Sequence, residues 1–163
     1  IADFTIVFPH WGEEYVYKPN KSQRQLAKLM TENGADLIIG THSHVLQSIE
    51  WIECDKGNKA LCYYSLGNYT SGQLAYPRVL GGMAKITIVN DSDSIYIDQA
   101  GIIPIISHYE WVKGTSLHKT YKLSDYTEKL EKRHSLNYYD STFSIKNLQQ
   151  LADQIIGDWI INQ

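Results

Sequence analysis

The order strand, helix, strand over residues 4–39 constrains the fold of this chain more than any other feature. Phe4 to Phe8 is β-branched and aromatic without alternating polar residues, as in a strand covered on both faces, so we expect it to be central in a sheet. A helical pattern over 20–34 and a short apolar segment, 37–39, follow. Such a unit almost always forms two parallel strands joined by a right-handed crossover. Both strands should therefore end at the same edge of one sheet.

The helix expected over 20–34 is about three turns long. Ser22 and Gln25 are a candidate capping pair at its start, and Gly34 is a candidate stop. Apolar residues at helical spacing, as on the apolar face of a helix, are Leu26, Leu29 and Met30.

The middle of the chain predicts antiparallel strands. Two pairs are expected: 48–54 with 60–69, and 81–90 with 94–98. Segment 101–106 predicts an edge strand, because Pro104 lacks the N–H that a central ladder needs. We expect these strands to form a second sheet that is antiparallel.

The carboxyl-terminal part predicts helices, with an amphipathic one over 144–159 and a more polar one over 124–134.

The expected fold is α/β, a single domain over 1–163 in which a parallel βαβ unit precedes antiparallel strands and helices. The chain opens without Met, directly on a strand expected to be central, which indicates a piece of a larger domain.

Charge argues against nucleic acid as a partner, and hydropathy argues against a membrane-spanning segment within these residues. The formal charge of −3 arises from interspersed signs without a basic stripe, so we expect no nucleic-acid partner. No apolar run approaches the roughly 20 residues of a membrane-spanning helix, and no signal peptide opens the chain.

Cys54 and Cys62 flank a turn-rich centre, so we expect them to face each other across a hairpin, either as a disulfide or as two reduced thiols.

Histidines follow both strands of the predicted parallel pair. His10 comes after the first strand, and His42 and His44 come after the second, so all three should gather at the carboxyl edge of the sheet. Two imidazoles at i and i+2 in an extended segment point the same way and can bind metal ions, although such pairs also occur by accident in surface loops. The sequence therefore makes these three histidines candidate ligands of a divalent metal.

Other polar residues have weaker claims. Glu13 and Glu14 are the nearest carboxylates; they are either solvated loop charges with a capping role, or Glu13 orients a histidine or binds a ligand. Asn68 follows Gly67 in a tight turn and is a candidate ligand contact, although turn chemistry alone explains both residues. The remaining histidines are expected at the surface: His108, His118 and His134.

Three sequence strings, HWGEEY, GADLIIGTHSHVLQSIEW and YSLGNY, together resemble the CapA-type poly-γ-glutamate capsule synthesis family, a branch of the calcineurin-like metallophosphoesterases. The resemblance covers Phe4 to Tyr69. It implies the carboxyl-terminal half of an α/β/β/α sandwich, with His10, His42 and His44 as ligands of divalent ions of the Mn, Fe or Zn class. Pro is usual in that family where this chain has Ser43 between the last two histidines.

The family's upstream Asp and Asn ligands have no counterpart here, so the resemblance implies an incomplete site that needs an amino-terminal half of the domain as its partner. We expect the chain alone to show no appreciable hydrolase activity. Three functions stay open: a metal-dependent hydrolase of a phosphoester or amide-like bond, a non-catalytic factor that binds or exports an anionic polymer, and a structural module with a decayed site. The resemblance further implies other capsule synthesis proteins as partners, and the extracellular face of the membrane.

Overall fold

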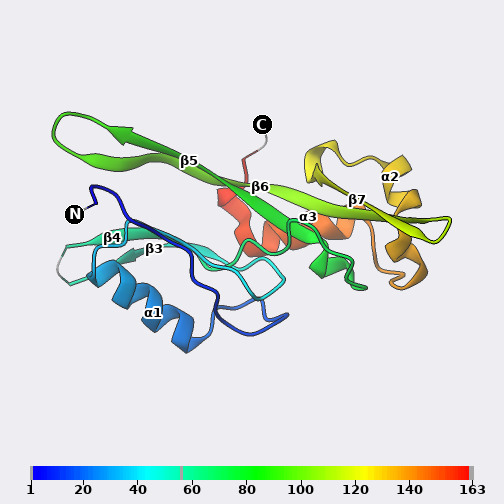
Figure 1. The fold of residues 1–163 in the computed structure, drawn as a ribbon, viewed down its shortest axis with the longest axis horizontal. Helices are drawn as coiled ribbons and strands as arrows, with labels where there is room; N and C mark the ends of the chain where they lie inside the picture. Colours follow the sequence, from blue (N-terminus) through cyan, green and yellow to red (C-terminus); the bar gives the residue numbers. More distant parts are fainter. Residues whose placement is uncertain (1, 56, 162–163) are drawn as a thin grey trace.

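The computed structural model describes residues 2–55 and 57–161, which form two sheets with helices (Figure 1). The first sheet has the order β1-β2-β4-β3, and the second has the order β5-β6-β7. The strands are β1 (Ile6–Val7), β2 (Leu37–Ile39), β3 (Ile49–Glu53), β4 (Lys59–Tyr63), β5 (Leu80–Asn90), β6 (Ile95–Val112) and β7 (Thr115–Lys122). The α-helices are α1 (Lys21–Glu32), α2 (Glu128–Arg133) and α3 (Ile145–Ile156). The 3₁₀ turns are η1 (Tyr76–Arg78), η2 (Leu123–Asp125), η3 (Ser135–Tyr138) and η4 (Gly157–Trp159).

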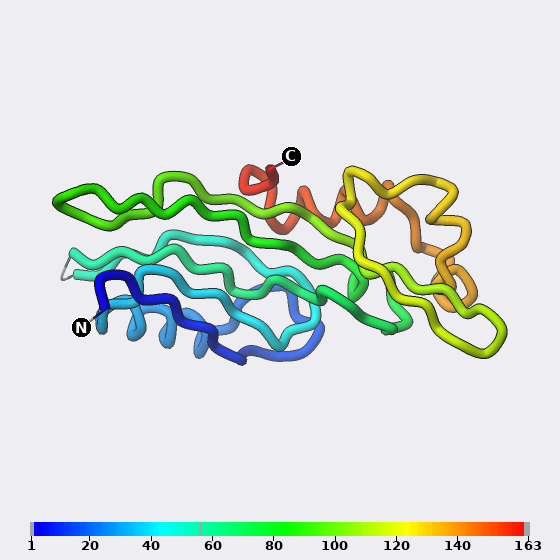
Figure 2. Tube along the Cα trace, turned by 45° about the horizontal axis from the view of Figure 1, so that its top comes forward, coloured from blue at the N-terminus to red at the C-terminus, as the bar shows by residue number. Residues whose placement is uncertain are grey.

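The main core lies where the two sheets and α3 meet. Leu61 and Tyr63 of β4 share one apolar cluster with Ile102 of β6 and Leu148 of α3. A smaller cluster lies under α1, where Ala27 packs with residues of β2 and β4. The tube in Figure 2 shows the long β5–β6 ribbon running beside the strands of the first sheet. The mixed α/β class, with a parallel pair, an antiparallel sheet and carboxyl-terminal helices, is confirmed.

Helix α1 forms where it was expected, but its cap and its buried face differ. Its N-cap is Asn20, whose side chain accepts from the Gln23 N–H while the Gln23 side chain accepts from the Asn20 N–H. The predicted pair Ser22–Gln25 was therefore wrong. The buried face is Gln23, Ala27 and Thr31, whereas Leu26 and Leu29 are largely exposed. Small Ala27 allows the helix to approach the sheet closely, which a leucine would prevent.

Strand β1 pairs in parallel with β2, as the crossover rule predicts, with Ile6 opposite Leu37. The prediction that this strand is central in its sheet was wrong for the residues that the structure describes. Strand β1 lies at the edge of its sheet, and 69% of Phe8 is exposed. An apolar run without polar alternation therefore does not by itself place a strand inside a sheet.

Strands β3 and β4 form the expected antiparallel pair, but they belong to the first sheet. Strand β4 also pairs in parallel with β2, so that Leu37 lies opposite Leu61 and Ile39 opposite Tyr63. Residues 60–63 are fully buried, which a strand between two neighbours requires. The prediction that this pair joins the antiparallel sheet was wrong.

Segment 101–106 is the middle of β6, the central strand of the second sheet, and the edge prediction from Pro104 was wrong. Pro104 lies opposite Gly82, whose N–H points away from β6 and donates to Leu66 O. In such a non-hydrogen-bonded pair the nitrogen of Pro104 points to the other side of β6. There β7 has already ended, because its last residue, Lys122, pairs with Ile105. The missing N–H of proline therefore leaves no partner unsatisfied.

The two cysteines do not face each other. Cys62 lies opposite Glu50 in the β3–β4 ladder, and Cys54 N–H donates to Asn58 O instead. Both thiols are free and buried. The expectation that they face each other is therefore wrong, because the hairpin closes nearer to Cys54 than the spacing suggested; of the two alternatives, the structure has the free thiols.

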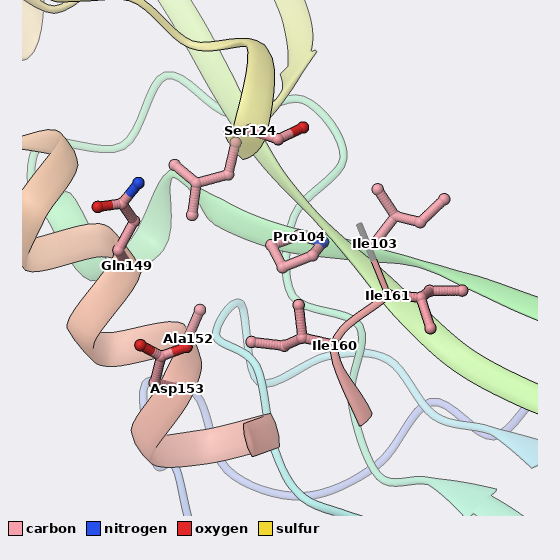
Figure 3. Close-up of a pocket in the computed structure, with 9 residues that line it drawn as sticks. Ile103, Pro104, Ser124, Gln149, Ala152, Asp153, Ile160 and Ile161 are labelled. Carbon is pink, nitrogen blue, oxygen red and sulfur yellow. The ribbon is translucent and has the colours of Figure 1, made fainter. Parts of the chain in front are cut away.

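Helix α3 confirms the amphipathic prediction, with Leu148, Ala152 and Ile156 fully buried. A cavity of about 370 Å³ lies between α3, η2 and β6. Figure 3 shows Gln149 and Asp153 of α3 on one side of it, with Ile103 and Pro104 of β6 across from them. Its lining includes none of the residues predicted for the site.

Candidate functional site

His10 and His42 lie side by side at the carboxyl ends of β1 and β2. An isolated parallel bridge joins His10 to Thr41 just beyond the two strands. Thr41 N–H donates to Pro9 O at 3.1 Å, and Trp11 N–H donates to Thr41 O at 3.2 Å. The imidazole centroids of His10 and His42 are 4.5 Å apart. The strand ends thus bring together two residues that are distant in sequence.

His44 is the third member of this imidazole cluster, which we define as His10, His42 and His44. Its ring centroid lies 6.3 Å from that of His42. Its Nδ1 is 2.9 Å from Asn68 Oδ1, and Asn68 Nδ2 donates to His44 O at 3.2 Å. The turn at Gly67 and Asn68 therefore holds His44 on both its ring and its backbone.

The hydrogen bonds indicate which ring nitrogen is free in two of these histidines. Asn68 Oδ1 only accepts, so in neutral His44 the proton sits on Nδ1. His10 Nδ1 is 3.2 Å from Thr41 Oγ1, whose hydroxyl donates to Pro9 O, so His10 Nδ1 also donates. This assignment leaves Nε2 of both rings with a lone pair. An imidazole held through Nδ1–H in this way is oriented as metal-binding histidines are.

Backbone strain is concentrated in this region. Outside glycine, positive φ occurs in the described residues at Tyr15 (67°), His42 (101°), His44 (57°) and Lys113 (49°). Three of these four belong to the cluster or touch it, and Lys113 lies in the β6–β7 turn. Such conformations cost about 1–3 kcal/mol each and persist where the surroundings hold them. Their concentration at one loop edge supports a functional site there.

Trp11 and two glycines form the base of the site. Trp11 is buried, and its Nε1–H donates to Tyr64 O at 2.9 Å. A Cβ on Gly40 would overlap Tyr64 O and Trp11 Nε1, so this position requires glycine. A Cβ on Gly12 would meet the Gln23 side chain at 2.8 Å, as expected for a turn that only glycine fits.

The two carboxylates have different neighbours. Glu13 Oε1 accepts from Asn20 Nδ2 at 3.2 Å, beside the start of α1. Glu14 Oε1 lies 3.8 Å from His44 Nε2. The contact with a histidine thus belongs to Glu14, whereas Glu13 supports the helix cap. Ligand binding by Glu13 and by Asn68 stays a prediction.

Arg78 and Tyr15 were not singled out from the sequence. Arg78 Cζ lies 3.6 Å from the centroid of the Tyr15 ring, and that ring stacks with His44 at 6.0 Å between centroids. Asn68 Nδ2 also donates to Arg78 O at 2.9 Å. No motif in the sequence marks Arg78, because only the packing of η1 against the loops brings it to the cluster.

Two of the three histidines expected at the surface are buried, and that prediction was wrong for His108 and His134. His108 contacts Tyr126 Oη and Glu110 Oε1, and Glu110 pairs with Arg133. His118 is exposed, as expected. A polar neighbourhood in sequence did not reveal these buried contacts, because most of the partners come from other elements.

His134 is held neutral by its surroundings. Its Nδ1 accepts from Leu136 N–H at 3.0 Å, and its Nε2 is 3.1 Å from Ser107 O. Burial, followed by the nearby His108, lowers the pKa of His134 from 6.5 to about 4. It therefore serves as a neutral core residue rather than a proton carrier near neutral pH.

The described residues do not by themselves form a complete metal site. No group of three or more His, Cys, Asp or Glu residues within 2–55 and 57–161 is arranged to hold a metal ion. The imidazole cluster supplies oriented nitrogens without the carboxylates that a dinuclear centre uses to neutralise its cations. The metal-ligand role of His10, His42 and His44 stays a prediction.

Comparison with known proteins finds a family match in the amino-terminal segment. Residues 2–73 match the family described as "Bacterial capsule synthesis protein PGA_cap". Two curated relatives are 47% identical over 72 residues: "PGA biosynthesis protein CapA" of Bacillus subtilis (strain 168) and "Capsule biosynthesis protein CapA" of Bacillus anthracis. The aligned part is 44% of this chain, and 18% and 16% of those proteins. Thus the aligned part of the chain spans less than a fifth of either relative.

The matched residues contain the whole imidazole cluster and Asn68, whereas Arg78 lies beyond them. In the part of the chain that the structure describes, no helix is long and apolar enough to cross a membrane.

Proposed function

Residues 2–73 match the bacterial capsule synthesis protein family, and from this premise we propose that the chain serves in the synthesis of a poly-γ-glutamate capsule. The names of the two relatives support this proposal. The observation that supports a particular site for this function is the imidazole cluster, which lies entirely within the matched segment.

The site that we propose for this role binds the anionic polymer. His10 is exposed, and His42 and His44 are partly exposed, so a ligand can reach all three rings. Protonated imidazoles attract carboxylates, and the strained loops hold the rings in one place before the ligand arrives.

Binding of a γ-linked glutamate oligomer to the chain, measured by calorimetry, tests this proposal. We expect His42→Ala to weaken binding, whereas His118→Ala, which removes an exposed imidazole outside the cluster, should leave it unchanged. An oligomer that binds both variants equally well would contradict the proposal.

A second function, metal-dependent hydrolysis, is supported by the two Nδ1-held histidines with free Nε2 atoms. Divalent ions of the Mn, Fe or Zn class would supply Lewis acidity, and His10, His42 and His44 would bind them. Metal content of the chain after dialysis is the test, and His42→Ala should retain less metal than the wild type. Binding of the oligomer to the metal-free chain separates the two functions. Chelator-sensitive turnover of a phosphodiester by this chain alone would contradict our expectation that it is inactive.

We further propose that the parent protein acts at the extracellular face of the membrane, together with other capsule synthesis proteins and an amino-terminal half of the same domain. The relatives' role in capsule biosynthesis supports this proposal. Protease treatment of intact cells, followed by detection of the tagged parent protein, tests it. A parent protein that is protected until the cells are lysed would contradict it.

A further inference from the structure

We infer that Arg78 is a carboxylate-binding residue beside the imidazole cluster. Within the proposed function, on which this part rests, its ligand is a free carboxylate of the γ-linked glutamate chain. Arg78 lies beyond residues 2–73, so the family match assigns it no role.

Two independent links hold Arg78 at the cluster. Its guanidinium lies over the ring of Tyr15, which in turn stacks with His44. Its backbone carbonyl accepts from Asn68, the same side chain that contacts the ring and the carbonyl of His44. Tyr15 is itself fixed by its N–H, which donates to Ser43 O at 2.7 Å. The guanidinium is therefore placed before any ligand binds, which lowers the entropic cost of binding.

The charge of Arg78 has no carboxylate partner in the part of the chain that the structure describes. Its Nη1 donates only a long bond, 3.4 Å, to the neutral Gln73 Oε1. By contrast, Arg24 pairs with Glu50 at 2.7 Å and Arg133 with Glu110 at 3.0 Å. A guanidinium is always charged, and its planar fork matches the two oxygens of a carboxylate. A half-buried guanidinium without an anion, stacked at the edge of a cluster, is therefore suited to an anion from outside.

The neighbouring charges favour a carboxylate over a phosphate. Glu14 lies 3.8 Å from His44 Nε2, and Glu13 is the adjacent residue. These two negative charges offset positive charge at the cluster, so the site lacks the excess of positive charge that a dianionic phosphate would need. A chain of separate monoanionic carboxylates fits the site better than a phosphate group does.

The first experiment follows the Nε–Hε signals of the arginines by NMR during titration with glutarate. We expect the Arg78 signal to shift and saturate, while the Arg24 signal stays in place because Glu50 already binds that guanidinium. Inorganic phosphate should shift Arg78 less at equal concentration. An unmoved Arg78 signal, equal shifts of all arginines, or a stronger response to phosphate would overturn the inference.

The second experiment measures the dissociation constant of a γ-linked glutamate oligomer. Arg78→Gln should weaken binding about tenfold or more, the usual effect of losing a charged hydrogen bond. The dissociation constant for Arg78→Lys should lie between those for the wild type and Arg78→Gln, because lysine keeps the charge but lacks the planar fork of the guanidinium. Arg24→Gln removes the same charge elsewhere and should bind as the wild type does. Circular dichroism checks that each variant is folded.

The outcomes separate this inference from the proposed function. If the oligomer binds wild type and Arg78→Gln equally while His42→Ala weakens binding, the role of Arg78 is refuted and the proposed function stands. If glutarate shifts Arg78 but the oligomer does not bind the wild type, the proposed function fails and the carboxylate site at Arg78 remains.

Discussion

Acidification should destabilise this protein through His134, before its carboxylates titrate. The imidazole is 1% exposed, and its pKa falls from 6.5 in the unfolded chain to about 4 in the folded one. Between these values the unfolded state binds a proton that the folded state does not, so the free energy of unfolding falls as the pH drops. The stabilisation is complete above about pH 6.5 and is lost progressively toward pH 4.

The magnitude follows from the two pKa values. Each pH unit between 6.5 and about 4 changes the free energy of unfolding by about 1.36 kcal/mol, so the full loss is about 3 kcal/mol. The main cause is burial, which disfavours the charged imidazolium, followed by the nearby His108. Protonation of Nδ1 would also remove the acceptor of Leu136 N–H inside the core. Hydrogen bonds lower the pKa of Glu110 and of Asp140 below the ordinary carboxyl value, so these groups act mainly at lower pH.

Urea unfolding at several pH values from about 7.5 to about 4.5 measures this loss. His134→Asn keeps an acceptor near Leu136 N–H but does not titrate, so its stability should depend less on pH than that of the wild type. His10→Asn, which removes an exposed imidazole that does not contribute to the pKa shift of His134, should leave the wild-type dependence intact. Equal slopes for the wild type and His134→Asn, or an NMR titration that places the pKa of His134 at or above 6.5, would refute the reasoning.

Three further predictions concern the scaffold. Asn20→Ala should cost about 1 kcal/mol of stability in urea unfolding by removing the α1 cap, whereas Ser22→Ala should change it by less than about 0.5; equal effects would contradict the assignment. Gly40→Ala should cost about 1–3 kcal/mol or more in the same assay, because its Cβ would overlap Tyr64 O, and an unchanged midpoint would show that the loop yields. Burial raises the pKa of the Cys62 thiol, so this thiol should resist a thiol reagent at about pH 8 until the protein is denatured. Intact-mass measurement checks this, and rapid labelling of Cys62 in the folded chain would count against its burial.

The sequence determined the local elements and the gathering of the three histidines. The order strand, helix, strand over 4–39 predicts, by the crossover rule, that the two strands are parallel. Parallel strands end at the same edge of a sheet, so His10 and His42 had to lie close together. The family strings fall within the same segment, and the family match covers it. These conclusions depend only on neighbours along the chain and on chirality.

Tertiary structure decided what depends on contacts between distant segments. Strand β4 lies beside β2 because these two segments pair in the folded chain. Proline is tolerated at position 104 of β6 because β7 has ended before it reaches Pro104. The burial of His134 has a similar cause, because its partner Ser107 lies on β6. Arg78 reaches the cluster because Asn68 and Tyr15 hold it there, and no pattern around residue 78 encodes that contact. Side-chain periodicity reports the environment of one element, whereas a site is made where several elements meet.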